Sequence, residues 1–158
     1  MTGRIIVLGF PRSGTGSMAK ILEVGHEKMN ENGTSDWHIV FDYKRKDGDE
    51  VTHVIRNPID VISSNLFTMN TSSLDFIKYK ANIDDKSIIS TIIEGFNKWT
   101  EQIEEIKPDK IVRIEDMETR VNTRPHSTLK WEDLKYVPID SINKLKEIAI
   151  EYGYETND

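Results

Sequence analysis

Hydrophobic residues follow two different spacings along this chain, and the two spacings alternate. Short apolar runs rich in β-branched residues occupy residues 5–8, 51–55 and 110–114, and runs of this length predict buried strands. Between and after these runs, apolar residues recur every three or four positions in four segments, which predicts helices, whereas residues 118–131 have no period. The predicted helices span about residues 15–23, 58–69, 86–106 and 141–152. Strands that alternate with helices predict an α/β fold, with a central parallel β-sheet flanked by helices.

The remaining segments give weaker patterns. Residues 24–29 are a candidate for a second strand, and we expect the polar stretch 30–36 to be a loop. Residues 37–43 fit either a short helix or a strand, and the pattern does not decide between them. We expect the last helix to be capped by Asp140 or Ser141.

Length and composition predict a single domain that spans residues 1–158. The chain contains no cysteine, which excludes disulfides and thiolate chemistry. Its net charge of −6 argues against nucleic-acid binding, which needs a basic face. The longest apolar runs have the length of strands, so we expect no membrane span and a cytoplasmic location.

A glycine-rich loop separates the first predicted strand from the first helix. Gly9 and Gly14 have the spacing of a Walker A loop, in which backbone N–H groups and the following helix start surround a phosphate. Thr15 and Gly16 stand where a Walker A loop has lysine and then serine or threonine. That lysine reaches the terminal phosphates of ATP or GTP. Since Arg12 is the only cation inside the loop, we predict a phosphate loop that is not built for ATP.

A second polar group follows the predicted strand at 51–55. Asn57 can cap a helix, Pro58 suits the first helical position, and Asp60 falls in the first turn. Apolar residues at 59, 62, 66 and 69 form one stripe, so Ser64 is expected on the opposite side, away from the core. Polar groups at the ends of two parallel strands share one edge of the sheet, where such sheets bind ligands.

Together the two stretches resemble the sulfotransferases that use 3′-phosphoadenosine 5′-phosphosulfate as donor. Residues 9–17 (GFPRSGTGS) are similar to the 5′-phosphosulfate loop of that family, and residues 56–64 (RNPIDVISS) to its 3′-phosphate element. The strand at 110–114, followed by Glu115 and Asp116, resembles a later strand of the family. The resemblance implies a three-layer P-loop-type fold for the chain.

The resemblance also implies which residues hold the donor. The loop residues that would bind the 5′-phosphosulfate are Pro11, Arg12, Ser13, Gly14, Thr15, Gly16 and Ser17. Arg56 and Ser64 would bind the 3′-phosphate, since the planar fork of arginine matches phosphate oxygens. Arg12 would neutralise the charge that grows on the bridging oxygen as the S–O bond breaks. Arg124, in a late basic segment, is a further candidate for contact with the donor.

The acceptor needs a general base within hydrogen-bond reach. In carbohydrate-type members of the family a glutamate after the loop helix has this role. Glu27 stands in that place, and His26 is the second candidate. Cytosolic members use a histidine before the 3′-phosphate strand, where His38 and His53 lie without the surrounding motif of the family. The alternative is that His26 and Glu27 only pack or form hydrogen bonds locally.

These inferences predict one function and leave two alternatives. The chain is expected to transfer a sulfo group from 3′-phosphoadenosine 5′-phosphosulfate to a hydroxyl or amine of a small-molecule or carbohydrate acceptor, with release of adenosine 3′,5′-bisphosphate. A P-loop kinase or NTPase is the first alternative, which the missing lysine disfavours. A nucleotide-binding module without catalytic activity is the second. We predict no metal site and no nucleic-acid or membrane partner. Nothing in the sequence indicates whether the protein is a monomer or an oligomer.

Overall fold

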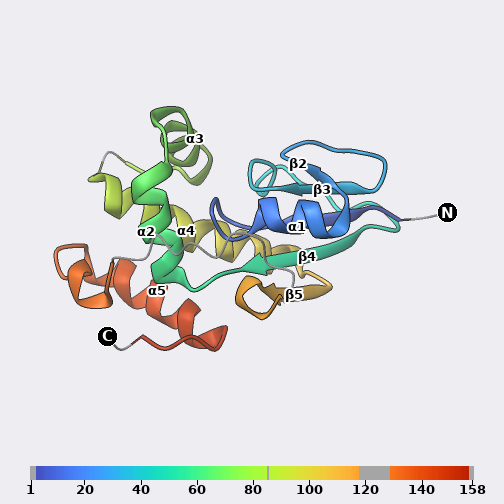
Figure 1. Cartoon of the computed structure of the whole chain (residues 1–158). Helices are drawn as coiled ribbons and strands as arrows, with labels where there is room; N and C mark the ends of the chain where they lie inside the picture. The colour runs from blue at the N-terminus through green and yellow to red at the C-terminus, as the bar shows by residue number, and fades with distance from the viewer. Residues whose placement is uncertain (1–2, 85, 118–128, 157–158) are drawn as a thin grey trace. The chain divides into compact units, whose positions relative to one another are not determined.

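Strands and helices alternate along much of the chain (Figure 1). The computed structural model describes residues 3–84, 86–117 and 129–156. The elements, in order, are β1 (Ile5–Leu8), α1 (Thr15–Leu22), β2 (Gly25–His26), β3 (Gly33–Asp36), β4 (Glu50–Ile55), α2 (Pro58–Thr68), α3 (Thr71–Ala81), α4 (Ile88–Ile106), β5 (Lys110–Arg113), η1 (Ile114–Asp116), η2 (Trp131–Leu134) and α5 (Ile139–Glu151). The protein is an α/β protein, as predicted.

The described strands form one sheet in the order β2-β3-β1-β4-β5, and every pairing is parallel. The chain leaves β1 toward β2 and β3 on one side, whereas β4 and β5 lie on the other side. The direction of the connections therefore reverses between β1 and β4. In open α/β sheets such a switch point makes a crevice at the carboxyl ends of the strands, where ligands bind.

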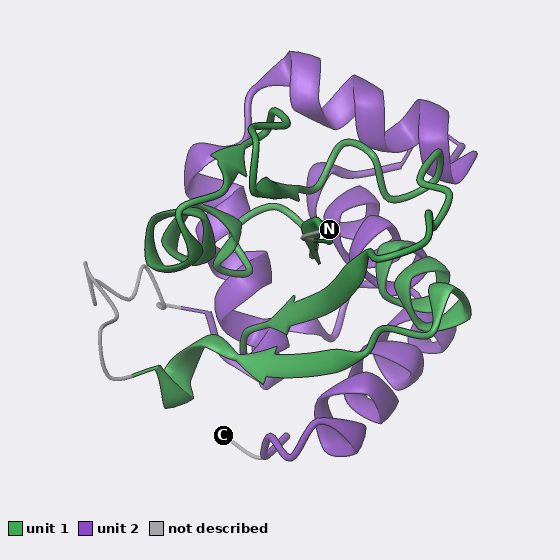
Figure 2. Cartoon of the chain, turned by 90° about the vertical axis from the view of Figure 1, so that its right-hand side faces the viewer, with its two compact units in different colours: residues 1–56, 99–123 green, residues 57–98, 124–158 purple. Residues whose placement is uncertain are grey.

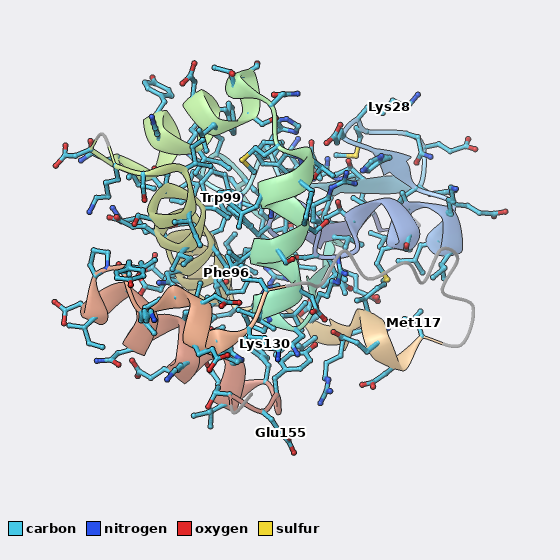
Figure 3. All side chains as sticks on the ribbon, turned by 60° about the vertical axis from the view of Figure 1, so that its left-hand side comes forward. Lys28, Phe96, Trp99, Met117, Lys130 and Glu155 are labelled. Atoms are coloured by element: carbon cyan, nitrogen blue, oxygen red, sulfur yellow. The ribbon has the colours of Figure 1, made fainter. Side chains whose placement is uncertain are left out.

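Both faces of β1 are buried, as is usual in a parallel sheet. On one face, Val7 lies with Val54 and Ile114 in a cluster that includes Met18 of α1. Met117, which follows η1, packs against the same cluster (Figure 3). On the other face, Ile6 and Leu8 are fully buried. Burial on both sides explains why residues 5–8 are apolar without alternation.

Contacts divide the chain into two compact units (Figure 2). Unit 1 comprises residues 1–56 and 99–123 and contains the sheet and α1. Unit 2 comprises residues 57–98 and 124–158 and contains α2, α3 and α5. Helix α4 contributes residues to both units. The expectation of a single domain stays a prediction.

Trp99 of α4 is the centre of an aromatic cluster in unit 1 (Figure 3). Its indole N–H donates a hydrogen bond of 2.9 Å to the carbonyl of Trp37. Its ring meets Phe10 and Phe41 edge-on, with centroid distances of 5.6 and 4.7 Å. Since Phe10 directly follows Gly9, this cluster fixes the start of the glycine loop.

Unit 2 begins at a capped helix. The Asn57 side chain accepts a hydrogen bond from the Ile59 N–H, and Pro58 occupies the start of α2, as predicted. Helix α2 packs against α5. The Asn97 side chain donates to the carbonyl of Ser141 at 3.1 Å, which ties α4 to the first turn of α5.

The expectation of a loop over residues 30–36 is wrong, because Gly33–Asp36 forms β3. The strand is polar in sequence yet buried. Its hydroxyls find acceptors within unit 1, since Thr34 Oγ1 donates to the carbonyl of Lys28 and Ser35 Oγ to that of Thr15, both at 2.6 Å. A strand whose buried side chains are polar gives no hydrophobic pattern to detect.

Three smaller expectations have mixed outcomes. The candidate strand within residues 24–29 is confirmed as β2. Residues 37–43 form neither a helix nor a strand, because turns follow β3 there. The expected caps of the last helix are wrong: α5 begins after Pro138 without a side-chain cap, so that Asp140 and Ser141 lie inside its first turn. None of the described helices combines the length and the hydropathy that crossing a bilayer requires.

Candidate functional site

The register of the sheet gathers polar residues at its carboxyl edge. Leu8, the last residue of β1, pairs with Asp36 of β3 and with His53 of β4. Glu27 directly follows β2, and Arg56 directly follows β4. Neighbouring strands lie about 4.8 Å apart. The glycine loop after β1 therefore shares one edge of unit 1 with the residues that follow β2, β3 and β4.

The glycine loop opens with a tight turn. The N–H of Ser13 donates to the carbonyl of Phe10 at 3.1 Å, and Pro11 and Arg12 are the two residues between them. Arg12 has a φ of 70°. Proline at the second position, positive φ at the third and a hydrogen bond that closes the four residues are the features of a type II turn. Such turns usually have glycine or asparagine at the third position.

Arg12 thus occupies a backbone conformation that costs a non-glycine residue about 1–2 kcal/mol. Glycine adopts the same conformation without this penalty. The chain therefore carries a cation at a position where any residue other than glycine has a strained backbone. Strain of this kind concentrates at functional sites. Since the side chain of Arg12 is exposed, a ligand can reach its guanidinium.

Close packing requires glycine at both ends of the loop. A Cβ on Gly9 would lie 2.9 Å from Cγ1 and 3.0 Å from the carbonyl oxygen of Val54. A Cβ on Gly14, whose φ is 114°, would lie 2.8 Å from Cγ1 of Ile114. A Cβ on Gly16, by contrast, would make an ordinary contact of 3.5 Å with the ring of His26. The absence of a side chain at Gly9 and Gly14 therefore lets β4 and η1 approach the loop.

Helix α1 starts without a side-chain cap, because its N-cap residue is Gly14, and its first turn contains no acidic residue. The N–H of Met18 donates to the carbonyl of Gly14 at 2.9 Å. Thr15, Gly16 and Ser17 precede Met18, and N–H groups at these positions have no acceptor within an α-helix. Such a helix start offers an anion backbone donors and the positive end of the helix dipole.

Arg56 reaches the turn from the end of β4. Its Nη1 donates a hydrogen bond of 3.2 Å to the carbonyl of Arg12. The register explains this contact, because β4 extends two residues beyond the level at which His53 pairs with Leu8. The acceptor is a neutral carbonyl, so this contact does not cancel the charge of Arg56. The structure thus brings Arg56 and the glycine loop together in unit 1.

Glu27 belongs to a connected cluster after β2 and β3. Its Oε1 accepts a hydrogen bond of 2.8 Å from Trp37 Nε1 and lies 4.0 Å from His38 Nδ1. Asp36 Oδ1 accepts a hydrogen bond of 2.8 Å from the backbone N–H of His38 and lies 3.0 Å from its Nδ1. The rings of Trp37 and His38 stack with centroids 3.8 Å apart.

This cluster has the chemistry of a proton acceptor. With Asp36 at Nδ1, a neutral His38 ring carries its proton on that nitrogen and presents Nε2 as an acceptor. The side chains of His38 and Glu27 are 39% and 42% exposed, so a bound molecule can reach both. Asp36 is buried and orients the ring. Sequence reasoning missed Asp36, although an aspartate two residues before a histidine was a usable signal.

His26 and His53 lie in contrasting environments. His26 is exposed, and its ring lies beside Gly16 in the first turn of α1. His53 is buried within β4, and burial lowers its pKa to about 4. A histidine that is neutral and buried in the central sheet has a structural role.

Ser64, one of the predicted donor contacts, belongs to unit 2. The expectation that Ser64 lies away from the core is wrong, because Ser64 is 2% exposed whereas Leu66 of the predicted stripe is 38% exposed. Of residues 58–65 in α2, all except Asp60 are buried, so the helix has no single apolar face there. The role of Ser64 in unit 2 stays a prediction. Arg124 lies outside the described residues.

Across residues 3–84, 86–117 and 129–156, no group of three or more histidine, aspartate or glutamate residues could hold a metal ion. Fold and site together define an α/β protein with a parallel five-stranded sheet and a glycine loop at its switch point. No family model, curated protein or solved structure matches the chain. Its function is therefore inferred from the residues of the site.

Proposed function

We propose that this protein is a sulfotransferase that uses 3′-phosphoadenosine 5′-phosphosulfate as donor. A hydroxyl or amine of the acceptor forms a bond to sulfur while the bond from sulfur to the bridging phosphate oxygen breaks. The proton of the acceptor passes to a base of the protein, and adenosine 3′,5′-bisphosphate leaves. The acceptor is a small molecule or a carbohydrate.

The observation that carries this proposal is the contact between Arg56 and the turn at Arg12. The donor has two anionic ends, and one backbone-lined loop cannot hold both. A second cation beside the loop is needed, and Arg56 is adjacent to it at the switch point of the sheet. Arginine binds phosphate oxygens through two parallel N–H groups, which makes it suitable for the 3′-phosphate.

Arg12 supports the proposal through its chemistry. A guanidinium does not deprotonate in proteins, so Arg12 would stabilise the developing charge on the leaving oxygen without donating a proton. Electrostatic stabilisation of this kind is often the largest contribution to catalysis. The backbone N–H groups of residues 13–17 would hold the sulfate and the 5′-phosphate.

Glu27 remains the proposed base, with His26 as the second candidate. The contacts of Glu27 support its pairing with His38, because the two side chains share one exposed cluster after β2 and β3. His38 is therefore a further candidate for accepting the proton of the acceptor. The proposal expects Asp36 to hold the His38 ring through Nδ1.

Calorimetric titration with adenosine 3′,5′-bisphosphate, compared with ATP and Mg²⁺, tests the proposal. We expect the bisphosphate to bind more tightly. Adenosine 5′-monophosphate is the matched ligand without a 3′-phosphate, and it should bind about tenfold or more weakly than the bisphosphate. Arg56→Ala should remove most of this difference. Arg113→Ala is the matched control, since Arg113 likewise lies at the carboxyl end of a strand and pairs with Asp116 at 3.6 Å.

Tighter binding of ATP with Mg²⁺ would reject the sulfotransferase proposal in favour of a kinase or NTPase. Tight binding of the bisphosphate, without transfer from the phosphosulfate donor to any of a panel of phenols, amines and sugars, would favour the nucleotide-binding module. The two alternatives therefore give different results in one set of measurements.

A further inference from the structure

Arg56 makes a contact that binding a 3′-phosphate would not require, because its Nη1 donates to the backbone of the glycine loop. We propose that Arg56 is also a positioning residue, which holds the loop in its anion-binding conformation. Affinity for an anion at the loop then depends on Arg56 even when the ligand has no 3′-phosphate. The identity of that anion rests on the proposed function, whereas the ordering of the loop does not.

The contact between Arg56 and the loop acts on Arg12, the residue of the loop that is not glycine and has a positive φ. Arg12 adopts a positive φ of 70° at the third position of the turn, where glycine is usual. A residue in this region persists only when its surroundings hold it there. The carbonyl that Arg56 binds belongs to Arg12 itself. The guanidinium of Arg56 therefore stabilises the peptide group that joins the strained Arg12 to Ser13.

One planar peptide unit joins the two hydrogen bonds of the turn. The carbonyl of Arg12 and the N–H of Ser13 belong to the same peptide, so their directions are fixed relative to each other. Arg56 binds the carbonyl at 3.2 Å, and the carbonyl of Phe10 accepts from the N–H at 3.1 Å. Together they hold this peptide plane at both of its polar ends, and its orientation sets that of the N–H groups that follow.

The two ends of the loop are held by the close packing of glycines rather than by Arg56. Gly9 is fixed by its close approach to Val54, and Gly14 by its approach to Ile114. Between these points, the turn at residues 10–13 carries the contact with Arg56. Loss of that contact should therefore loosen the turn and leave the packing of the strands unchanged.

Hydrogen exchange of the Ser13 amide in the ligand-free protein tests the ordering of the loop. In Arg56→Ala we expect exchange at Ser13 to accelerate about tenfold, as loss of one charge-assisted hydrogen bond allows. In Arg113→Ala it should stay at the wild-type rate. Arg56→Lys should restore most of the protection, because its ammonium is also a charged donor on a long side chain. Equal protection of Ser13 in the wild type and both Arg56 variants would overturn the proposal.

Calorimetry with adenosine 5′-phosphosulfate, which has no 3′-phosphate, supplies the second measurement. We expect Arg56→Ala to weaken its binding about tenfold, because the loop that binds the phosphosulfate is less ordered. Unchanged affinity would overturn the positioning role and leave Arg56 as a ligand of the 3′-phosphate alone. If the wild type binds neither this nucleotide nor the bisphosphate, the sulfotransferase proposal fails, and exchange at Ser13 still decides the role of Arg56.

Discussion

The two edges of the sheet in unit 1 hold their arginines in different ways. At the amino edge, Arg4 precedes β1 and makes two hydrogen bonds to the carboxylate of Asp49, at 2.9 and 2.8 Å. Arg45 reaches the same edge and binds Asp109 at 2.8 Å. At the carboxyl edge, Arg56 donates to a backbone carbonyl, and the guanidinium of Arg12 is exposed on a strained turn.

The amino edge is a network in which charge is neutralised inside the chain. Asp49 also accepts hydrogen bonds from the hydroxyl of Tyr43 at 2.6 Å and from the N–H of Lys46 at 3.0 Å. The hydrogen bonds from Arg4 hold the pKa of Asp49 well below its usual range. Burial, together with the bond to Asp49, raises the pKa of Tyr43. These groups therefore stabilise the fold.

The comparison separates two uses of the same residue type. An arginine with a buried carboxylate partner stabilises the native state, because the pair is formed only there. At the carboxyl edge, Arg12 and Arg56 lie beside a helix start that favours an external anion. Substitution of Asp49 at the amino edge should therefore change stability without changing anion affinity, whereas substitution of Arg12 or Arg56 at the carboxyl edge should mainly change anion affinity.

Asp49→Ala should have the largest effect on stability. The change leaves the Arg4 guanidinium and the Tyr43 hydroxyl without their shared acceptor, and removing one partner of such a pair costs about 3–4 kcal/mol. Urea unfolding measures this loss. Calorimetry with adenosine 3′,5′-bisphosphate should show unchanged affinity at a temperature where the variant is folded. If Asp49→Ala lost as much affinity for the bisphosphate as Arg56→Ala, the two edges would not differ in function, and the comparison would be wrong.

Acid should destabilise the protein through His53. Burial lowers the pKa of His53 from 6.5 to about 4. Between pH 6.5 and pH 4, the unfolded chain therefore binds a proton at His53 that the native state does not bind. Stability therefore falls as the pH falls below about 6.5, by about 2.5 kcal/mol at pH 4.5. Asp49 adds a further loss of stability below about pH 4, because the hydrogen bonds that lower its pKa stabilise only the ionised carboxylate.

Urea unfolding of the wild type and of His53→Gln from pH 7 to 4.5 measures the contribution of His53. The variant should lose most of the slope over this range. An equal slope in both proteins would assign the acid sensitivity to other groups.

Gly14→Ala should destabilise the protein by about 2 kcal/mol, because a Cβ there meets Ile114 and a φ of 114° disfavours any side chain. Gly16→Ala is the matched control within the same loop and helix. It should raise stability by about 0.5–1 kcal/mol, since glycine inside a helix is unfavourable and a Cβ fits beside His26. Thermal unfolding compares the two variants, and equal losses would contradict the packing described for Gly14.

Arg12→Gly should have a small effect on stability, opposite in sign to that of Asp49→Ala and Gly14→Ala. Glycine accepts the positive φ of the turn, so the free energy of unfolding should rise by about 1 kcal/mol. Affinity for the bisphosphate should fall, because a cation has been removed from the carboxyl edge. A destabilised Arg12→Gly protein would show that the Arg12 side chain stabilises the fold, as Arg4 does.

The carboxyl edge was partly predictable from local signals. The glycine spacing of residues 9–14 and the sequence Arg56-Asn57-Pro58 each mark a point where a strand gives way to a loop or a helix. Their meeting at the turn required the register of β1 with β4, which no local pattern contains. The place of Ser64 was predicted wrongly, because burial of α2 on nearly all sides depends on its neighbours.

The cluster of Glu27, Asp36 and His38 shows the other limit. Glu27 was named from its position after the loop helix, whereas β3 is a buried polar strand without hydrophobic periodicity. Without β3, nothing placed Asp36 beside β1 or brought His38 within 4.0 Å of Glu27.

The sequence by itself determined the alternation of strands and helices, the glycine loop and the capped start of α2, because these depend on short-range spacing and on the conformational preferences of glycine, proline and asparagine. Only the tertiary structure decided that Arg4 meets a carboxylate and that Arg56 meets the Arg12 carbonyl. The physical reason is that parallel strands pair residues distant in the chain, so the partner of each charge is set by strand order and register.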